Sequence, residues 1–96
     1  MSDAFAALRE RFVARCRDDG SVLEAALATP SLRTGEDFRR LIHRLSGGGG
    51  TFGFPALSRV AADAETMLLE GTGLDDDTLE RLVDQIRALD AAAGAP

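Results

Sequence analysis

The sequence predicts an all-α protein, an antiparallel four-helix bundle whose N-terminal helix is kinked or split. The 96 residues are 45% hydrophobic with five Phe as the only aromatics, and they are rich in Ala, Leu, Arg, Glu and Asp, which favours helix over strand. Apolar residues also recur at spacings of three and four in four segments. Four amphipathic helices on short connectors can bury their apolar faces only against one another, so residues 1–96 are expected to form a single domain.

The first helical region is expected within residues 1–30. Its apolar stripe extends from residue 3 to about residue 28, and Pro30 ends it. Gly20 interrupts the stripe, so this region is either one kinked helix or two helices that nearly align. The residues of the stripe are Phe5, Leu8, Phe12, Cys16, Leu23 and Leu27.

Residues 35–70 are expected to form a helical hairpin. Its first helix begins near Gly35 or Glu36, and its apolar stripe continues across the glycine run at residues 47–50 as far as Phe52. Pro55 suits the first position of the second helix, which ends at Glu70 before a glycine. The stripes contain Phe38, Leu41, Ile42 and Leu45 in the first helix, and Leu57, Val60, Ala61, Ala64, Met67 and Leu68 in the second.

The last helix is expected over residues 75–92. Asp75 or Asp76 caps its first turn, where negative side chains also interact favourably with the helix dipole. Its apolar stripe contains Leu79, Leu82, Val83, Ile86 and Leu89.

The charge distribution singles out one segment. A net charge of −5 argues against a nucleic-acid-binding protein, which would need a basic face. Residues 33–50 carry four Arg against two acids, whereas residues 51–96 carry three Arg against nine acids, and the chain has no Lys. His43, the only histidine, therefore lies in the one basic stretch. The chain begins without a secretion signal and has no apolar run of ~20 residues, so we expect a cytoplasmic protein that does not bind membranes.

A helical wheel at ~100° per residue places His43 opposite the apolar stripe of its helix. Small residues lie near it one turn later, and arginines lie near it one turn earlier. An exposed imidazole is largely neutral at cellular pH, so its nitrogen can attack phosphorus, and positive charge nearby can stabilise the phosphoryl oxygens. The small residues on this face are Ser46, Gly47 and Gly50, and the arginines that could supply the charge are Arg39, Arg40 and Arg44.

The glycine run has two interpretations. Each Gly inside a helix costs about 1 kcal/mol relative to Ala, so a helical run needs a reason. Gly48 and Gly49 lean toward the bundle, where a missing Cβ lets helices approach closely, whereas Gly47 and Gly50 leave room beside His43 for a partner. Alternatively, the run is a flexible loop and the helix ends near Ser46, which would place His43 in a negative C-terminal turn that disfavours phosphate. The apolar stripe favours the continuous helix.

Other chemistry has less support. A lone surface histidine is most often only a solvated side chain. Cys16 falls on the apolar stripe and is expected to pack in the core. One His and one Cys far apart in the sequence do not predict a metal site. The glycine run lacks the Gly-Lys-Ser/Thr ending and the preceding strand of a nucleotide-binding loop.

Residues 43–57 resemble the signature of histidine-phosphotransfer (HPt) domains. That signature has a phosphorylated His, then an apolar residue, a Lys-Gly pair, small residues, a further Gly and a Leu. The matching residues are His43, Leu45, Ser46 with Gly47, Gly48 to Gly50, Gly53 and Leu57. Glu65 falls where the family often has an acid. Ser46 stands where the family usually has Lys, so either an arginine or the partner must supply the positive charge.

The resemblance implies a phosphorelay carrier. His43 would accept a phosphoryl group from the aspartyl phosphate of a receiver domain and pass it to another receiver. The implied partners are response-regulator receiver domains and hybrid histidine kinases. The implied carrier has no ATP site and no cofactor of its own, since the receiver supplies Mg²⁺, and it is not an autonomous kinase. The expected phosphate-proximal residues are Arg39, Arg40, Ser46 and Gly47, and the expected docking residues are Arg44, Gly47 and Gly50.

Two alternatives to the carrier remain open. The first is an HPt-like adaptor or inhibitor that docks on receivers or histidine kinases without being phosphorylated, which the serine at position 46 favours. The second is a helical oligomerisation domain, which accounts for the apolar stripes but not for the small residues around His43.

Overall fold

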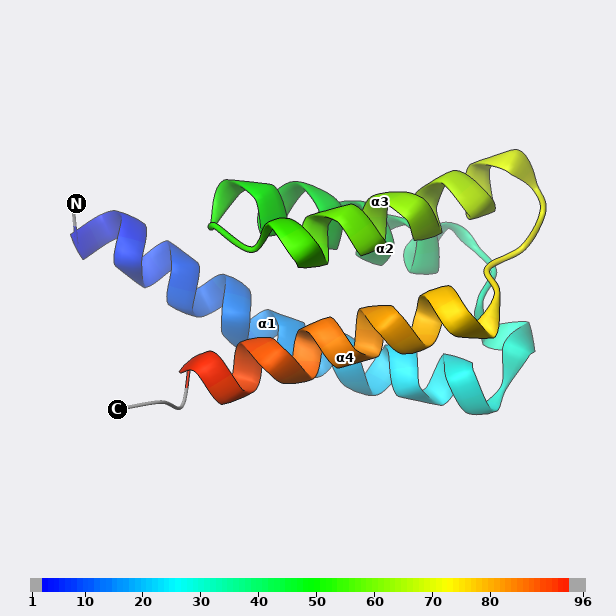
Figure 1. Cartoon of the computed structure of the whole chain (residues 1–96), viewed down its shortest axis with the longest axis horizontal. Helices are drawn as coiled ribbons and strands as arrows, with labels where there is room; N and C mark the ends of the chain where they lie inside the picture. The colour runs from blue at the N-terminus through cyan, green and yellow to red at the C-terminus, as the bar shows by residue number, and fades with distance from the viewer. Residues whose placement is uncertain (1–2, 94–96) are drawn as a thin grey trace.

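The computed structural model describes residues 3–93 and the side chains of residues 3–89. The elements are α1 (Asp3–Ala28), a short 3₁₀ helix η1 (Pro30–Leu32), α2 (Glu36–Thr51), α3 (Pro55–Glu70) and α4 (Asp76–Ala93). Successive helices run in opposite directions along the long axis of the molecule (Figure 1), so the predicted antiparallel four-helix bundle is confirmed. The ends of the expected domain, residues 1–2 and 94–96, lie outside the described residues.

The N-terminal region is one helix that bends near its middle (Figure 1), so the alternative of two separate helices is wrong. Gly20 is buried within α1, and a Cβ there would meet Cγ2 of Ile86 at 3.0 Å. This glycine therefore serves the close approach of α1 and α4 and does not end the helix. Hydrogen bonds of the helical backbone continue through it because the packing against α4 compensates for its low helix propensity.

The N-terminal half of α1 packs on the turn between α2 and α3. The Phe12 ring stacks on the Phe52 ring with centroids 5.2 Å apart, and Nε of Arg9 donates to the Phe52 carbonyl at 3.1 Å. Leu8, predicted to belong to the core stripe, is instead 50% exposed. Through Phe12, this part of α1 packs against the turn and against Gly48 near the end of α2. Leu8 lies outside this contact, so the buried face of the helix is narrower here than the spacing predicts.

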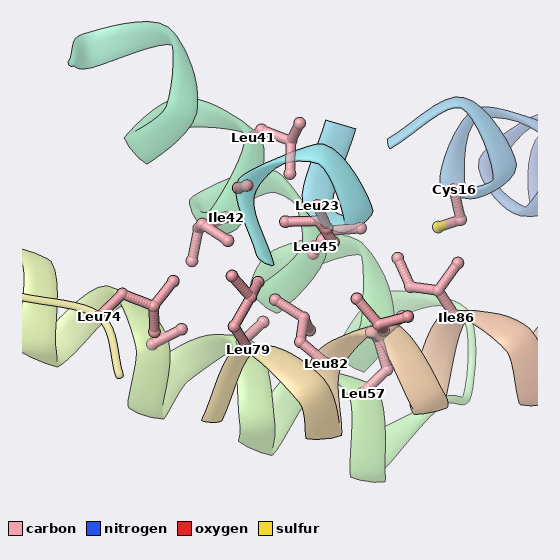
Figure 2. Packing of buried hydrophobic residues seen from close by; sticks show 14 of the residues in the cluster. Cys16, Leu23, Leu41, Ile42, Leu45, Leu57, Leu74, Leu79, Leu82 and Ile86 are labelled. Carbon is pink, nitrogen blue, oxygen red and sulfur yellow. The ribbon is translucent and has the colours of Figure 1, made fainter. Parts of the chain in front are cut away.

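The core lies along the bundle axis and receives side chains from all four helices (Figure 2). Its largest side chains are almost fully inaccessible to solvent, which is the main source of stability for a chain of this size. They are Leu23 of α1, Ile42 and Leu45 of α2, Leu57 of α3, and Leu79 and Leu82 of α4.

Arg33, in the connector before α2, joins the end of α1 to the α3–α4 connector at one end of the bundle (Figure 1). Its side chain is 8% exposed and donates to the carbonyl oxygens of Ala26, Leu27 and Leu74 at 2.9 to 3.1 Å. Its Nη1 also lies 2.6 Å from the Asp76 carboxylate. The carbonyls at the end of α1 have no partners within the helix, so a cation there satisfies them. In the sequence, Arg33 stands out only as one residue of the basic stretch.

The start of α4 is capped as the sequence predicts. The Asp75 carboxylate accepts a hydrogen bond from the Thr78 amide at 2.7 Å, and this bond lowers the pKa of Asp75. At the other end of the same connector, Gly71 ends α3 with a φ of +76°, which a side chain would strain.

Candidate functional site

His43 lies in the middle of α2, which continues through the glycine run to Thr51. The alternative in which the helix ends near Ser46 is therefore wrong. The His43 side chain is 74% exposed, while Leu41, Ile42 and Leu45 of the same helix are buried. The wheel predicted this orientation because a helix with one apolar stripe must turn the opposite face to solvent.

A carboxylate from the neighbouring helix holds the imidazole. Oε2 of Glu65 on α3 lies 2.6 Å from Nδ1 of His43, and the Glu65 side chain is 22% exposed. An ionised carboxylate can only accept a hydrogen bond, so Nδ1 is the donor, and in the neutral ring Nε2 keeps its lone pair. The pair therefore fixes both the tautomer and the direction of the ring. The sequence indicated Glu65 only through the family resemblance.

Two arginines lie one turn before His43. Arg39 and Arg40 line a pocket of about 230 Å³ together with His43, Glu65 and Leu69. Their side chains are 47% and 68% exposed, so both guanidinium groups can reach an anion in solvent. The predicted association of these two arginines with the histidine is thus present in the structure.

The residues one turn after His43 leave open space. A Cβ at Gly47 would have no other atom within 4 Å, and a Cβ at Gly50 would meet only Oγ of Ser58 at 3.5 Å. The backbone carbonyl of Ser46 accepts a hydrogen bond from this same Ser58 hydroxyl at 2.7 Å, which ties α3 to α2 beneath the exposed face. A bulky partner can therefore approach His43 over a flat part of α2.

The other two glycines of the run lie where helices meet. A Cβ at Gly48 would overlap the Phe12 ring of α1. A Cβ at Gly49 would lie 2.9 Å from the Ser58 amide and 3.2 Å from the Phe54 carbonyl, both of which are backbone atoms. As the wheel predicted, close packing accounts for these two positions.

Arg44 occupies a different place from the other arginines of α2. Its Nη2 lies 2.9 Å from Oδ1 of Asp19 on α1, and the side chains are 35% and 9% exposed. A buried carboxylate needs a cation, so loss of Arg44 would leave the charge of Asp19 without compensation between α1 and α2. Arg44 does not line the His43 pocket, and the sequence could not predict its partner because Asp19 is 25 residues away.

Cys16 contributes to packing, since its side chain is 1% exposed. Burial, assisted by the nearby Asp19 carboxylate, raises the pKa of its thiol to about 12, so it is not a nucleophile at neutral pH. Among the described residues, no group of His, Cys, Asp and Glu side chains could hold a metal ion. None of the described helices has the length and apolar character needed to cross a membrane.

The fold and the site define a class: a helical bundle that presents one exposed histidine, oriented by a carboxylate, with a free Nε2 and an open approach. Residues 7–92 match the model of the Hpt domain, and the chain belongs to this family. Membership indicates a phosphotransfer role in two-component systems, where Hpt domains generally interact with receiver domains and kinases. Comparison with curated proteins and with solved structures gave no match.

Proposed function

We propose that this protein is a phosphorelay carrier that accepts a phosphoryl group on Nε2 of His43 and passes it on. The donor is the aspartyl phosphate of a receiver domain, and the acceptor is the aspartate of another receiver. The observation that carries the proposal is the 2.6 Å contact between Nδ1 of His43 and Glu65, which leaves the exposed Nε2 as a nucleophile. The proposed partners are response-regulator receivers and hybrid histidine kinases in the cytoplasm.

Transfer to His43 is a single displacement at phosphorus. The Nε2 lone pair forms the new N–P bond, the P–O bond to the receiver aspartate breaks, and that aspartate leaves as a carboxylate. The Nδ1 proton stays in place, so the ring becomes positively charged as the bond forms. The Glu65 carboxylate faces this charge and stabilises it, and the reverse step returns the phosphoryl group to a receiver.

The face around His43 supports docking of a receiver. Gly47 and Gly50 leave the approach open, and Arg39 and Arg40 offer positive charge at its edge. The carrier itself needs neither ATP nor a cofactor for this step, because the receiver holds the Mg²⁺ that neutralises the transferring group. Ser46 brings no positive charge, so the charge on the carrier side comes from the two arginines.

The deciding experiment is phosphoryl transfer from a radiolabelled receiver to wild type and to His43→Gln. We expect label on wild type alone, and we expect this label to be lost in acid, as a phosphohistidine requires. Equal labelling of the two proteins would contradict the proposal. Stable binding of the receiver without labelling of wild type would support the adaptor alternative instead.

A further inference from the structure

Glu36, in the first turn of α2, forms ion pairs with both arginines of the His43 pocket. Its Oε1 lies 3.0 Å from Nη2 of Arg40 and 3.9 Å from Nη2 of Arg39. The Glu36 side chain is 62% exposed, and both arginine side chains are similarly accessible. Exposed ion pairs of this kind contribute little to stability, so the arginines can exchange this carboxylate for another anion at low cost.

The geometry of α2 directs the histidine toward these arginines. Side chains on a helix lean toward its N-terminus, so His43 leans over the turn that carries Arg39 and Arg40. Both of them line the same pocket as His43. A phosphoryl group on Nε2 brings two negative charges and three acceptor oxygens, whereas Glu36 offers one charge. Arginine binds phosphate through two parallel hydrogen bonds, so the phosphoryl group competes strongly with the carboxylate.

The composition leaves few other cations on this helix for the phosphoryl group. The chain has no Lys, and Ser46 is uncharged, so no cation follows His43 on its exposed face. Of the four arginines in residues 33–50, Arg33 is bound to carbonyl groups and Arg44 to Asp19. Arg39 and Arg40 are the remaining cations of this stretch.

We propose that Glu36 binds Arg39 and Arg40 while His43 is unphosphorylated, and that both arginines move from Glu36 to the phosphoryl oxygens when His43 is phosphorylated. The inference rests on the proposed function, because it concerns the phosphorylated state of the same site. The arginines contact the phosphoryl group, and Glu36 acts as a positioning residue that competes for them. Glu36 therefore weakens the retention of the phosphoryl group and favours its onward transfer.

The test uses phosphoramidate as a donor that needs no partner protein. Nε2 attacks its phosphorus, the N–P bond of the reagent breaks, and ammonia leaves after taking a proton from solvent. The ³¹P resonance of the labelled protein then reports the titration of the phosphoryl group and its rate of hydrolysis. The variants are Glu36→Gln, Arg39→Gln, Arg40→Gln and the control Asp37→Asn. Asp37 is the other acid in the first turn of α2, and its replacement removes the same charge without freeing either arginine.

We expect Glu36→Gln to lower the ³¹P titration midpoint and to lengthen the half-life of the phosphohistidine by about two- to fivefold, in line with the strength of an exposed ion pair. Each arginine variant should shift both values the other way, and Asp37→Asn should leave them close to wild type. Circular dichroism checks that each variant is folded.

Two outcomes separate this inference from the proposed function. If wild type is labelled but Glu36→Gln and Asp37→Asn have equal effects, the exchange is overturned, because the loss of one negative charge near the site then accounts for both results. The carrier role stays intact in that case. A wild type that takes no label from phosphoramidate or from a phosphorylated receiver overturns both.

Discussion

The glycine run of α2 consists of two pairs with opposite surroundings. Gly48 and Gly49 lie against α1 and α3, where a Cβ would overlap the Phe12 ring or the backbone near Ser58. Gly47 and Gly50 lie on the face of His43, where a Cβ would meet open space or a contact of ordinary length. The same residue type therefore serves helix packing on one side of α2 and access to the histidine on the other.

The arginines divide in the same way. Arg44 on the inner side of α2 pairs with the buried Asp19, whereas Arg39 and Arg40 remain exposed beside the histidine. One face of α2 holds the bundle together and the other carries the chemistry. Substitutions on the outer face should therefore change phosphoryl transfer with little effect on stability, and those on the inner face should do the opposite.

The largest expected effect is that of Gly47→Arg. A long side chain at this open position would stand between His43 and a docked receiver, so transfer should fall by about 100-fold, the loss expected when a clash at an interface costs about 3 kcal/mol. Receiver-to-carrier transfer rates measure this effect, and urea unfolding should show a stability no lower than that of wild type, because arginine has a higher helix propensity than glycine. Gly47→Ala is the matched control and should transfer normally. A normal rate for Gly47→Arg would place the docking surface elsewhere.

The next effect is that of Glu65→Gln. The amide can still orient the ring but no longer offers a negative charge to the imidazolium that forms during transfer. The rate should fall roughly tenfold to 100-fold, because the hydrogen bond to the ring remains but its negative charge is lost. Rates of labelling by phosphoramidate measure it without a partner. Glu70→Gln, an exposed change on the same helix, is the control, and equal rates for both variants would remove the assigned role of Glu65.

Alanine substitutions compare the two glycine pairs directly. Gly49→Ala should destabilise the protein by about 1–3 kcal/mol, because the methyl group meets backbone atoms that cannot move aside without separating α2 from α3. Gly50→Ala should instead stabilise it by about 0.5–1 kcal/mol, because alanine has the higher helix propensity and its methyl group fits. Urea unfolding of both variants measures the difference. Stabilisation by Gly49→Ala would show that the two pairs are equivalent.

Much of the difference between the two faces of α2 could be predicted from the sequence, because helical periodicity fixes which residues share a face. The spacing predicted that His43 lies on the exposed face of α2 and that Gly48 and Gly49 lie on the packed face. It also predicted that α2 continues to the end of the glycine run. It failed for Leu8, since the wheel does not reveal that the N-terminal half of α1 bends toward the α2–α3 turn. An apolar stripe shows which face of a helix a residue occupies, but it does not show whether another helix packs on that face at every turn.

Contacts between distant segments could not be predicted from spacing. Glu65 entered through the family resemblance, and the pairing of Arg44 with Asp19 was missed because both look like surface charges in the sequence. The sequence likewise gives no sign that Arg33, one of the four arginines of the basic stretch, is bound to a carbonyl group of α1 and to one of the α3–α4 connector. Such partners depend on how the helices are rotated against one another, which composition and periodicity leave open.

The smallest effect concerns Cys16, which is buried on the inner side of the bundle, whereas His43 is exposed on the outer side. Burial raises the pKa of the Cys16 thiol from 9.0 to about 12 in the folded protein, so the unfolded chain ionises first as the pH rises above 9. The stability that depends on the protonated thiol is fully present below pH 9 and is lost between pH 9 and pH 12. Stability at pH 10 should be about 1 kcal/mol lower than at pH 8.

The composition makes this a clean measurement. The chain has no Lys and no Tyr, so Cys16 is the one side chain of the unfolded chain expected to titrate between pH 9 and pH 11. Urea unfolding at pH 8 and pH 10 should show the loss for wild type. Cys16→Ala, although less stable at both values because it leaves a cavity, should show almost none. Equal losses for the two proteins would mean that the thiol is not responsible for the pH dependence.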